Sequence, residues 1–440
     1  MKIIKIISLI IILILSTITL TGCYDSNGIE NLAYVIALGL DKGENLNLKL
    51  SLQIPTLSSS NSSGNSSSGS SSGGSSSQAS DATVISVECS TIDEGLNLIN
   101  SYISKKINLS HCKAIIISEE LSKEGISEYI FTFANNLEIR PNCHILISKT
   151  SAYNFLSDFT PSLESIAARY YELILNSSSY SGYTENNYLY TFYEDMLSTK
   201  AEASAILVNL NKNASSESKQ EGNSTDANQN STSPEEENTE ESINTSNNDG
   251  AYTAGDTPIK SQSKNEALGT AVFKGDKFIG ELNNIETLCH LIIASTLDKA
   301  EINIPNPFDE TKKLSLSIRL NNKTKNRVDI IDGTTLISCN VKIAANVNTM
   351  DYNIDLTKKE NLEKIEKILE DTLRKNISDY LYKTSKEFNA DISGFGKYAI
   401  PKYLTWKDWE ESNWLENYQN ALFNVNVKTT VESGYLYNKI

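Results

Sequence analysis

Two long polar stretches interrupt this chain and decide how the rest of it can fold. Residues 58–80 are almost entirely Ser, Gly and Asn, and residues 211–264 are rich in Asn, Ser, Thr and Glu. Such segments bury too little apolar surface to offset the conformational entropy lost on folding, so we expect both to be disordered. The remainder divides into an N-terminal block of residues 24–210, which contains the Ser/Gly insert, and a C-terminal block of residues 265–440. As a second option, residues 265–300 form a small middle subdomain of their own.

The N-terminal residues have the features of a bacterial lipoprotein signal peptide, which we assign to residues 1–22. Two lysines precede an apolar run from residue 6 to residue 20. This run is shorter than the roughly 20 residues that a membrane-spanning helix needs. It ends in Leu20-Thr21-Gly22-Cys23, a pattern in which the Cys23 thiol takes a diacylglyceryl group before the peptide is cleaved. Acyl chains such as palmitate would then hold the mature protein on the outer face of a membrane. The alternative is an ordinary secretory signal with a chance cysteine.

The composition argues against several classes of function. The 440 residues include 55 acidic and 39 basic side chains, which gives a formal net charge of −16 at pH 7. An acidic chain lacks the basic surface that nucleic acid binding requires. Three histidines in the whole chain leave little room for a histidine-rich metal site or a histidine-based hydrolase. We therefore expect no enzymatic activity, no catalytic residue, no cofactor and no nucleic acid partner.

The remaining cysteines do not form an obvious disulfide framework. Their number is odd and no two are close in sequence: Cys89, Cys112, Cys143, Cys289 and Cys339. Three of them adjoin a histidine, in His111-Cys112, Cys143-His144 and Cys289-His290. Neighbours on a strand point to opposite faces and cannot readily share a metal ion, so we interpret these thiols as small buried hydrophobic groups.

Apolar runs in the N-terminal block alternate between strand and helix patterns. Strands are predicted at residues 33–40, 46–54, 82–87, 112–118, 144–149 and 203–210. Helices are predicted at residues 92–104, 119–135 and 163–176, the last with Thr160 as its N-cap and Pro161 at its first position. The Ser/Gly insert lies between two of these strands, so it is expected to be a hairpin or crossover loop. This order of elements indicates a mixed sheet covered by helices.

The C-terminal block begins with a hairpin and contains the longest predicted helix. Two short runs meet at Gly275-Asp276, where we predict a turn, and a helix over residues 284–294 follows. Strands are predicted at residues 314–321, 328–332, 335–347 and 423–431. A helix from residue 358 to residue 388 carries an apolar stripe, with a capping box of Thr357 and Glu360. One long helix on an antiparallel sheet would bury that stripe. We therefore predict an α+β fold of several domains, with mixed or antiparallel sheets and packed helices.

Some polar residues and glycines could serve either a partner or the fold itself. Asp41-Lys42-Gly43 could contact a partner, although a hairpin turn is the simpler interpretation. Glu138 and Arg140 could pair with another subunit, form a structural ion pair or be exposed. Gly394 and Gly396 suggest backbone positions with positive φ, which is first a requirement of folding.

Three tryptophans lie close together near the C-terminus. Trp406, Trp409 and Trp414 could present an aromatic face to a membrane or to a partner helix. Packing against the second domain is the alternative that we favour.

Short motifs occur in a recognisable order along nearly the whole mature chain. The first is Cys23-Tyr24-Asp25-Ser26-Asn27-Gly28-Ile29-Glu30-Asn31-Leu32-Ala33-Tyr34-Val35. Those that follow are Leu109-Ser110-His111-Cys112-Lys113, Glu138-Ile139-Arg140-Pro141-Asn142, Leu163-Glu164-Ser165-Ile166, Gly269-Thr270-Ala271-Val272-Phe273-Lys274, Glu281-Leu282-Asn283 and Asp391-Ile392-Ser393-Gly394-Phe395-Gly396. Together they resemble the Ger(x)C family of spore germination lipoproteins. Tyr24 departs from that pattern, because the family usually has Trp there, and both polar inserts are additions to it.

The resemblance implies a location, partners and a fold. Ger(x)C proteins are the C subunits of nutrient germinant receptors, on the outer face of the spore inner membrane. Their partners are a larger polytopic subunit and a transporter-like subunit. The family is multi-domain α+β, and no catalysis is known for it.

Three functions compete at this point. The first is a non-enzymatic germinant receptor subunit held on the membrane through Cys23. The second is a solute-binding lipoprotein of a membrane transporter, although a long disordered tether is unlike the short hinge that such proteins close on their ligand. The third is a lytic lipoprotein of the cell wall, which would need catalytic residues that the sequence does not offer.

Overall fold

The computed structural model describes residues 3–10, 28–56, 82–159, 166–214, 250–261, 263–309, 311–348 and 355–432. Residues 3–10 are helical. Within the described residues, no helix is both long and apolar enough to cross a membrane. Cys23, the Ser/Gly insert and the predicted helix start at Thr160 and Pro161 lie outside the described residues.

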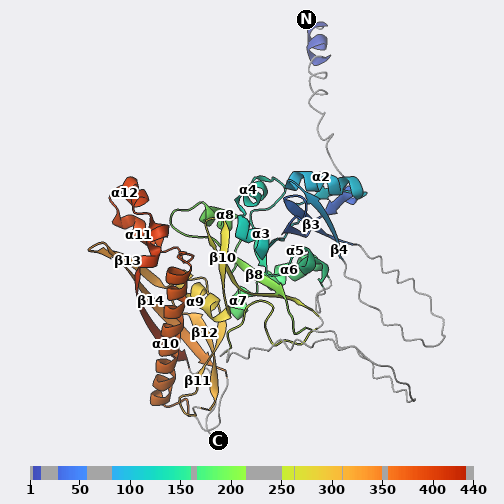
Figure 1. The fold of residues 1–440 in the computed structure, drawn as a ribbon. Coiled ribbons are helices and arrows are strands. Elements are labelled where there is room, and N and C mark those ends of the chain that lie inside the picture. Colours follow the sequence, from blue (N-terminus) through green and yellow to red (C-terminus); the bar gives the residue numbers. More distant parts are fainter. Residues whose placement is uncertain are drawn as a thin grey trace, which may run out of the picture.

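The larger sheet has eight strands in the order β10-β9-β8-β7-β6-β2-β3-β4 (Figure 1). Its strands are β2 (Ala37–Lys42), β3 (Leu48–Pro55), β4 (Ala82–Cys89), β6 (Ala114–Ser118), β7 (His144–Ser148), β8 (Ser204–Leu210), β9 (Asn265–Lys274) and β10 (Lys277–Leu282). The four central strands, β2, β6, β7 and β8, are parallel, and an antiparallel hairpin extends the sheet on each side. The Ser/Gly insert therefore connects the two strands of a hairpin, β3 and β4, as one of the two sequence-based alternatives predicted.

Helices cover both faces of this sheet because its central strands are mostly apolar and buried on both sides. Every residue of β6 and β7 is buried, which is typical of parallel strands between helical layers. Ile115 and Ile117 pack with α2 (Ile92–Tyr102), α3 (Glu119–Glu124), α4 (Ser127–Asn135) and α8 (Leu189–Met196). Ile116 points the other way and packs with α5 (Ala152–Ser157) and α6 (Ala167–Leu175). A short helix, α7 (Ser178–Ser181), follows.

Two elements of the first block differ from their predicted form. The predicted strand over residues 33–40 is split into β1 (Leu32–Tyr34) and β2, and β1 pairs instead with β5 (Lys106–Asn108). The predicted helix over residues 119–135 is broken into α3 and α4 at Gly125. The φ of Gly125 is +122°, a conformation that ends a right-handed helix.

The second sheet consists of β11 (Ala300–Pro305), β12 (Lys313–Leu320), β13 (Lys325–Ile331), β14 (Thr334–Val347) and β15 (Leu422–Glu432). Three of its pairings are antiparallel, as predicted, but β15 runs parallel to β14. The long helix α10 (Lys359–Tyr382) packs against β15 and buries its apolar stripe in the same core as α9 (Asn284–Ala294). Figure 1 shows α10 lying along this sheet, on the opposite side of the molecule from α2 and α4. The predicted α+β class with several sheets and packed helices is confirmed.

Smaller helices complete the C-terminal half. They are α11 (Gly396–Ala399), α12 (Trp406–Glu411) and α13 (Trp414–Asn417), and a π-helical turn, Lys383–Glu387, continues α10. The predicted capping box at the start of α10 is wrong. Its N-cap is Lys358, without a capping side chain, and the hydroxyl of Thr357 donates to Asp355 instead.

Parts of the segment expected to be a linker lie within the described residues and are packed. Residues 211–214 and 250–261 are packed, and Ala254 is fully buried with its N–H donating to the carbonyl of Leu268 at 3.1 Å. The predicted linker of residues 211–264 is therefore too long at both ends. The strands that flank it, β8 and β9, are hydrogen-bonded neighbours, so residues 265–282 complete the first sheet.

Candidate functional site

The carboxyl ends of the parallel strands β2, β6, β7 and β8 meet at one edge of the larger sheet, where ligands bind in open sheets of this kind. Polar side chains follow three of these strand ends: Glu119 after β6, Lys149 after β7, and Asn211 after β8. A cavity of about 680 Å³ opens there and is also lined by Lys212 and Lys264. We take this edge as the candidate functional site.

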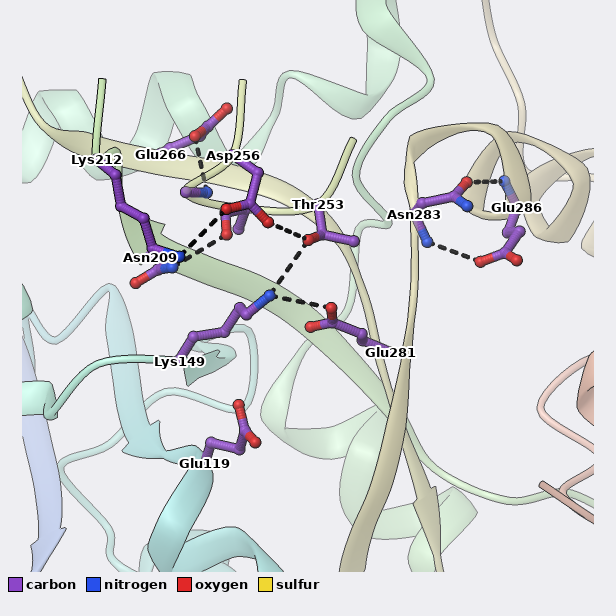
Figure 2. Close-up of polar contacts among 12 residues, drawn as sticks. Glu119, Lys149, Asn209, Lys212, Thr253, Asp256, Glu266, Glu281, Asn283 and Glu286 are labelled. Carbon is purple, nitrogen blue, oxygen red and sulfur yellow. Dashed lines mark hydrogen bonds and ion pairs between the residues drawn. The ribbon is translucent and has the colours of Figure 1, made fainter. Parts of the chain in front are cut away.

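Lys149 is the centre of this site. Its ammonium donates to Oε1 of Glu281 at 3.0 Å and to the hydroxyl of Thr253 at 3.2 Å (Figure 2). The Thr253 hydroxyl donates in turn to Oδ2 of Asp256 at 3.1 Å. One lysine thus connects the end of β7, the segment after the second insert, and the end of β10. Because Lys149 and Glu281 are partly exposed, their ion pair contributes at most about 1 kcal/mol to stability.

Amide and carboxylate groups hold the segment after the second insert against the sheet. The Asn209 amide donates to the carbonyl of Ala254 at 3.1 Å. Oε2 of Glu266 accepts the N–H of Gly255 at 2.8 Å and the side-chain amide of Asn211 at 3.0 Å. These contacts explain why residues 250–261 pack although their composition is polar. They also involve the side chains of Asn209 and Asn211, both of which line the cavity.

The residues that follow β10 join the two halves of the chain. Asn283 caps α9 in a capping box with Glu286, in which each side chain accepts the other's backbone N–H at 2.9 Å (Figure 2). From the end of α10, the Lys383 ammonium donates to the carbonyl of Glu281 at 2.9 Å and to Oε2 of Glu286 at 2.8 Å. Glu281 is therefore held by Lys149 from the first sheet and by Lys383 from the second half.

A second polar contact between the halves centres on Asp391, which is fully buried. Its carboxylate accepts the N–H groups of Phe395 at 3.0 Å and Gly396 at 2.9 Å, and the indole N–H of Trp414 at 2.9 Å. Burial raises the pKa of Asp391 from its ordinary value of 3.8 to about 6, although the three donors oppose the rise. The Asp391 carbonyl accepts the N–H of Glu202, just before β8, at 3.0 Å.

Glu202 completes this contact. Its carboxylate accepts the N–H of Gly275, in the β9–β10 turn, at 2.7 Å. Burial raises the pKa of Glu202 to about 7, and the nearby Asp391 adds to the rise. Two acids with raised pKa values lie together here, but backbone N–H groups occupy both carboxylates, so we assign them to folding.

The glycines and tryptophans singled out in the sequence have different structural roles. Gly394 has a φ of +66°, as predicted. Gly396 lies in α11 without a positive φ, and it is a glycine because a Cβ there would collide with the backbone of Lys200. Trp409 and Trp414 are buried, as the packing alternative predicted, whereas Trp406 remains exposed.

The other polar candidates serve the fold. Asp41 is buried within β2 and accepts the N–H groups of Ala152 at 2.7 Å and Tyr153 at 2.8 Å, so it anchors the start of α5 rather than a partner. Glu138 accepts the N–H of Leu109 at 2.8 Å across neighbouring loops. Arg140 is exposed.

The histidines of the three His–Cys neighbours make different contacts. The ring of His144 hydrogen-bonds the carbonyl of Asn187 at 3.0 Å, and burial lowers its pKa to about 4. The ring of His290 lies 2.9 Å from the Tyr380 hydroxyl, and His111 is exposed. In the described part of the chain, no three His, Cys, Asp or Glu residues are grouped to hold a metal ion.

Sequence reasoning did not single out Lys149, Lys383 or the carboxylate of Asp391. A usable signal existed for Lys149, since it comes two residues after the buried apolar run Ile145-Leu146-Ile147 of a parallel strand. Asp391 was noticed only as part of a glycine motif, and nothing local marks Lys383 among the many lysines of its helix.

Two family models match this chain in order. Residues 25–212 match the spore germination protein N-terminal domain, and residues 268–434 match the C-terminal domain described as spore germination B3/GerAC like. Together they cover most of the chain and leave out mainly the N-terminal segment and the residues around the second insert.

Curated relatives from Bacillus subtilis (strain 168) are similar to this chain. YfkR, a candidate spore germination protein, is 22% identical over 97% of both chains. Spore germination protein KC is 26% identical over 35% of this chain and 36% of its own length, and spore germination protein A3 is 28% identical over 32% and 35%. The crystal structure of the GerBC protein, 13% identical, covers 90% of this chain and 96% of that chain with a TM-score of 0.49.

Proposed function

Because this chain belongs to the GerAC-like, or Ger(x)C, family of spore germination proteins, we propose that it is the non-enzymatic lipoprotein subunit of a nutrient germinant receptor. The observation that carries the proposal is the ordered match of both family domains along one chain. The full-length similarity to YfkR supports it. Its role is structural: the folded body, fixed at the membrane, holds the other receptor subunits in a working arrangement.

The anchor in this proposal is a diacylglyceryl group on Cys23, after removal of residues 1–22. The described fold resumes at residue 28, so at most about 18 Å of extended chain separates it from the anchor. A tether this short keeps the body at the lipid surface. The location proposed is the outer face of the spore inner membrane.

The partners in this proposal are the polytopic and the transporter-like membrane subunits of the receptor. A subunit that positions partners needs a rigid body more than a catalytic site. The contact of Lys383 with Glu281 and the contact of Asp391 with Glu202 both connect the second half to the first sheet. For the same reason we propose that the two family domains form one body, in which β9 and β10, matched largely by the C-terminal family domain, complete the first sheet.

A Cys23→Ala variant tests the anchor. We expect it to fold like the wild type, to leave the membrane fraction and to abolish nutrient germination. Ser26→Ala is the matched control, because it lies just after the lipidated position and keeps the Cys23 thiol; it should stay in the membrane fraction. Normal germination of Cys23→Ala spores would contradict the anchoring argument.

The cavity at the candidate site favours one alternative, a solute-binding lipoprotein of a membrane transporter. Its volume of about 680 Å³ and its polar walls would suit a small solute. Calorimetric titration with amino acids and nucleosides decides between the two. Saturable binding that a Lys149→Met variant loses would support the alternative, and no binding would leave the receptor role as the better account.

A further inference from the structure

Two cysteines that are distant in sequence lie side by side. The sulfurs of Cys112 and Cys143 are 3.7 Å apart, and both residues are buried. Each comes just before one of the neighbouring parallel strands β6 and β7, in which Ala114 pairs with His144. The N–H of His144 also donates to the carbonyl of Lys113 at 2.9 Å, which holds the two strand starts together. Cys112 and Cys143 are far apart in the sequence. They become neighbours only because β6 and β7 pair side by side in this register.

The two thiols differ in their access to solvent. Cys112 lines a small cavity of about 170 Å³ with His111, Lys113 and Arg140. Cys143 does not line it, and burial raises the pKa of the Cys143 thiol. Cys112 is therefore the thiol that a small molecule reaches first. Lys113, Arg140 and one carboxylate, Glu172, give the cavity a net excess of one cation, which favours an oxidant that carries negative charge.

We propose that Cys112 and Cys143 form a redox-active pair that closes to a disulfide across β6 and β7. The oxidant is a small anionic disulfide of the glutathione type. The Cys112 thiolate attacks one of its sulfurs, which forms a mixed disulfide and releases one small thiol. The Cys143 thiolate then attacks the sulfur of Cys112 and releases the second small thiol. Two protein thiols are oxidised and one small disulfide is reduced, and the two protein-thiol protons end on the two released thiols.

The geometry requires little movement for this step. A disulfide bond is about 2.05 Å long, so the two sulfurs must approach by less than 2 Å. The bond would tie together the ends of the segment that contains α3 and α4. This inference does not depend on the receptor role and can fail or succeed separately from it.

The test uses the full chain, refolded from its reduced form in a buffer of oxidised and reduced glutathione. Remaining thiols are alkylated with N-ethylmaleimide, and the protein is digested with trypsin and analysed by mass spectrometry. Trypsin releases Cys112 in residues 107–113 and Cys143 in residues 124–149, because the Arg140–Pro141 bond resists cleavage. The two peptides can therefore remain together only through a disulfide.

We expect most of both tryptic segments to be recovered as one disulfide-linked peptide. This linked peptide should disappear on treatment with dithiothreitol. Cys112→Ser and Cys143→Ser should each abolish it, whereas Cys289→Ser, a buried cysteine on α9, should retain it. Recovery of both peptides only in unlinked, alkylated form would overturn the proposal. A mixture in which Cys112 pairs equally with Cys89, Cys289 or Cys339 would also overturn it, since it would show no preference set by the fold.

Discussion

Asp391→Ala should destabilise the protein by an amount that grows as the pH is lowered. The substitution leaves three buried N–H donors without an acceptor, those of Phe395, Gly396 and Trp414. Each orphaned donor costs about 1–3 kcal/mol, so the loss at pH 8 is on the order of 3 kcal/mol or more.

The pH dependence follows from the raised pKa of Asp391. Between pH 3.8 and about 6, the folded state keeps a proton on Asp391 that the unfolded chain has released. The wild type therefore gains stability as the pH falls through 6, and all of this gain is present below 3.8. A shift of about two units corresponds to about 3 kcal/mol. The alanine variant lacks this gain, so its deficit should grow by up to about 3 kcal/mol between pH 8 and pH 4.

Urea unfolding followed by tryptophan fluorescence measures this deficit. All three tryptophans of the chain lie between residues 406 and 414, and Trp414 donates to Asp391 directly. Asp329→Ala is the control, since that carboxylate is partly exposed and pairs with Lys402 and Arg327; its effect should be small. A deficit for Asp391→Ala that stays constant, or that shrinks as the pH falls, would refute the reasoning, because the three donors would then outweigh burial.

Further predictions concern the same junction and are measured by urea unfolding. Glu202→Gln keeps the shape of the side chain and removes a buried carboxylate whose pKa is raised to about 7. It should stabilise the protein by about 2–3 kcal/mol at pH 8, where the carboxylate is charged, and change its stability little at pH 5. A loss of stability at pH 8 would contradict this prediction. Gly396→Ala should lower the free energy of unfolding by about 2–3 kcal/mol, because the added Cβ collides with the backbone. Gly333→Ala should lower it by only about 1 kcal/mol, because its added methyl group meets open space and only the positive φ is unfavourable. Equal losses for the two variants would contradict the steric argument. Lys383→Met should cost about 1–2 kcal/mol, whereas Lys359→Met, in an exposed pair on the same helix, should cost less than about 0.5 kcal/mol. Equal losses of stability in the two variants would show that the Lys383 contacts contribute no more than an exposed ion pair.

The elements predicted correctly from the sequence are those in which the spacing of apolar residues along one segment shows how that segment is buried. The apolar runs of β6 and β7 and the stripe of α10 each report the surroundings of a single segment. The hairpin of β9 and β10 was also predictable, because its turn residues adjoin its strands. The family motifs then identified the chain more sharply than any one element could.

The parts that sequence reasoning missed depend on contacts between distant segments. Nothing within β9 indicates that it pairs with β8, across the second insert, or that β15 runs parallel to β14. Residues 250–261 looked like linker because their polar side chains suggest exposure, yet Asn209 and Glu266 satisfy their backbone groups. The candidate site was hidden for the same reason: Lys149, Glu281 and Lys383 meet only in the folded chain.

The most direct test of the receptor role is nutrient germination of spores that lack this gene. Release of calcium dipicolinate would be followed over a panel of amino acids, nucleosides and sugars, with dodecylamine or high pressure as the control that bypasses nutrient receptors. The account predicts that the mutant spores lose their response to one class of nutrient and keep the control response, and that the restored gene returns it. An unchanged response to every nutrient, in a strain without a second copy of this receptor, would contradict it.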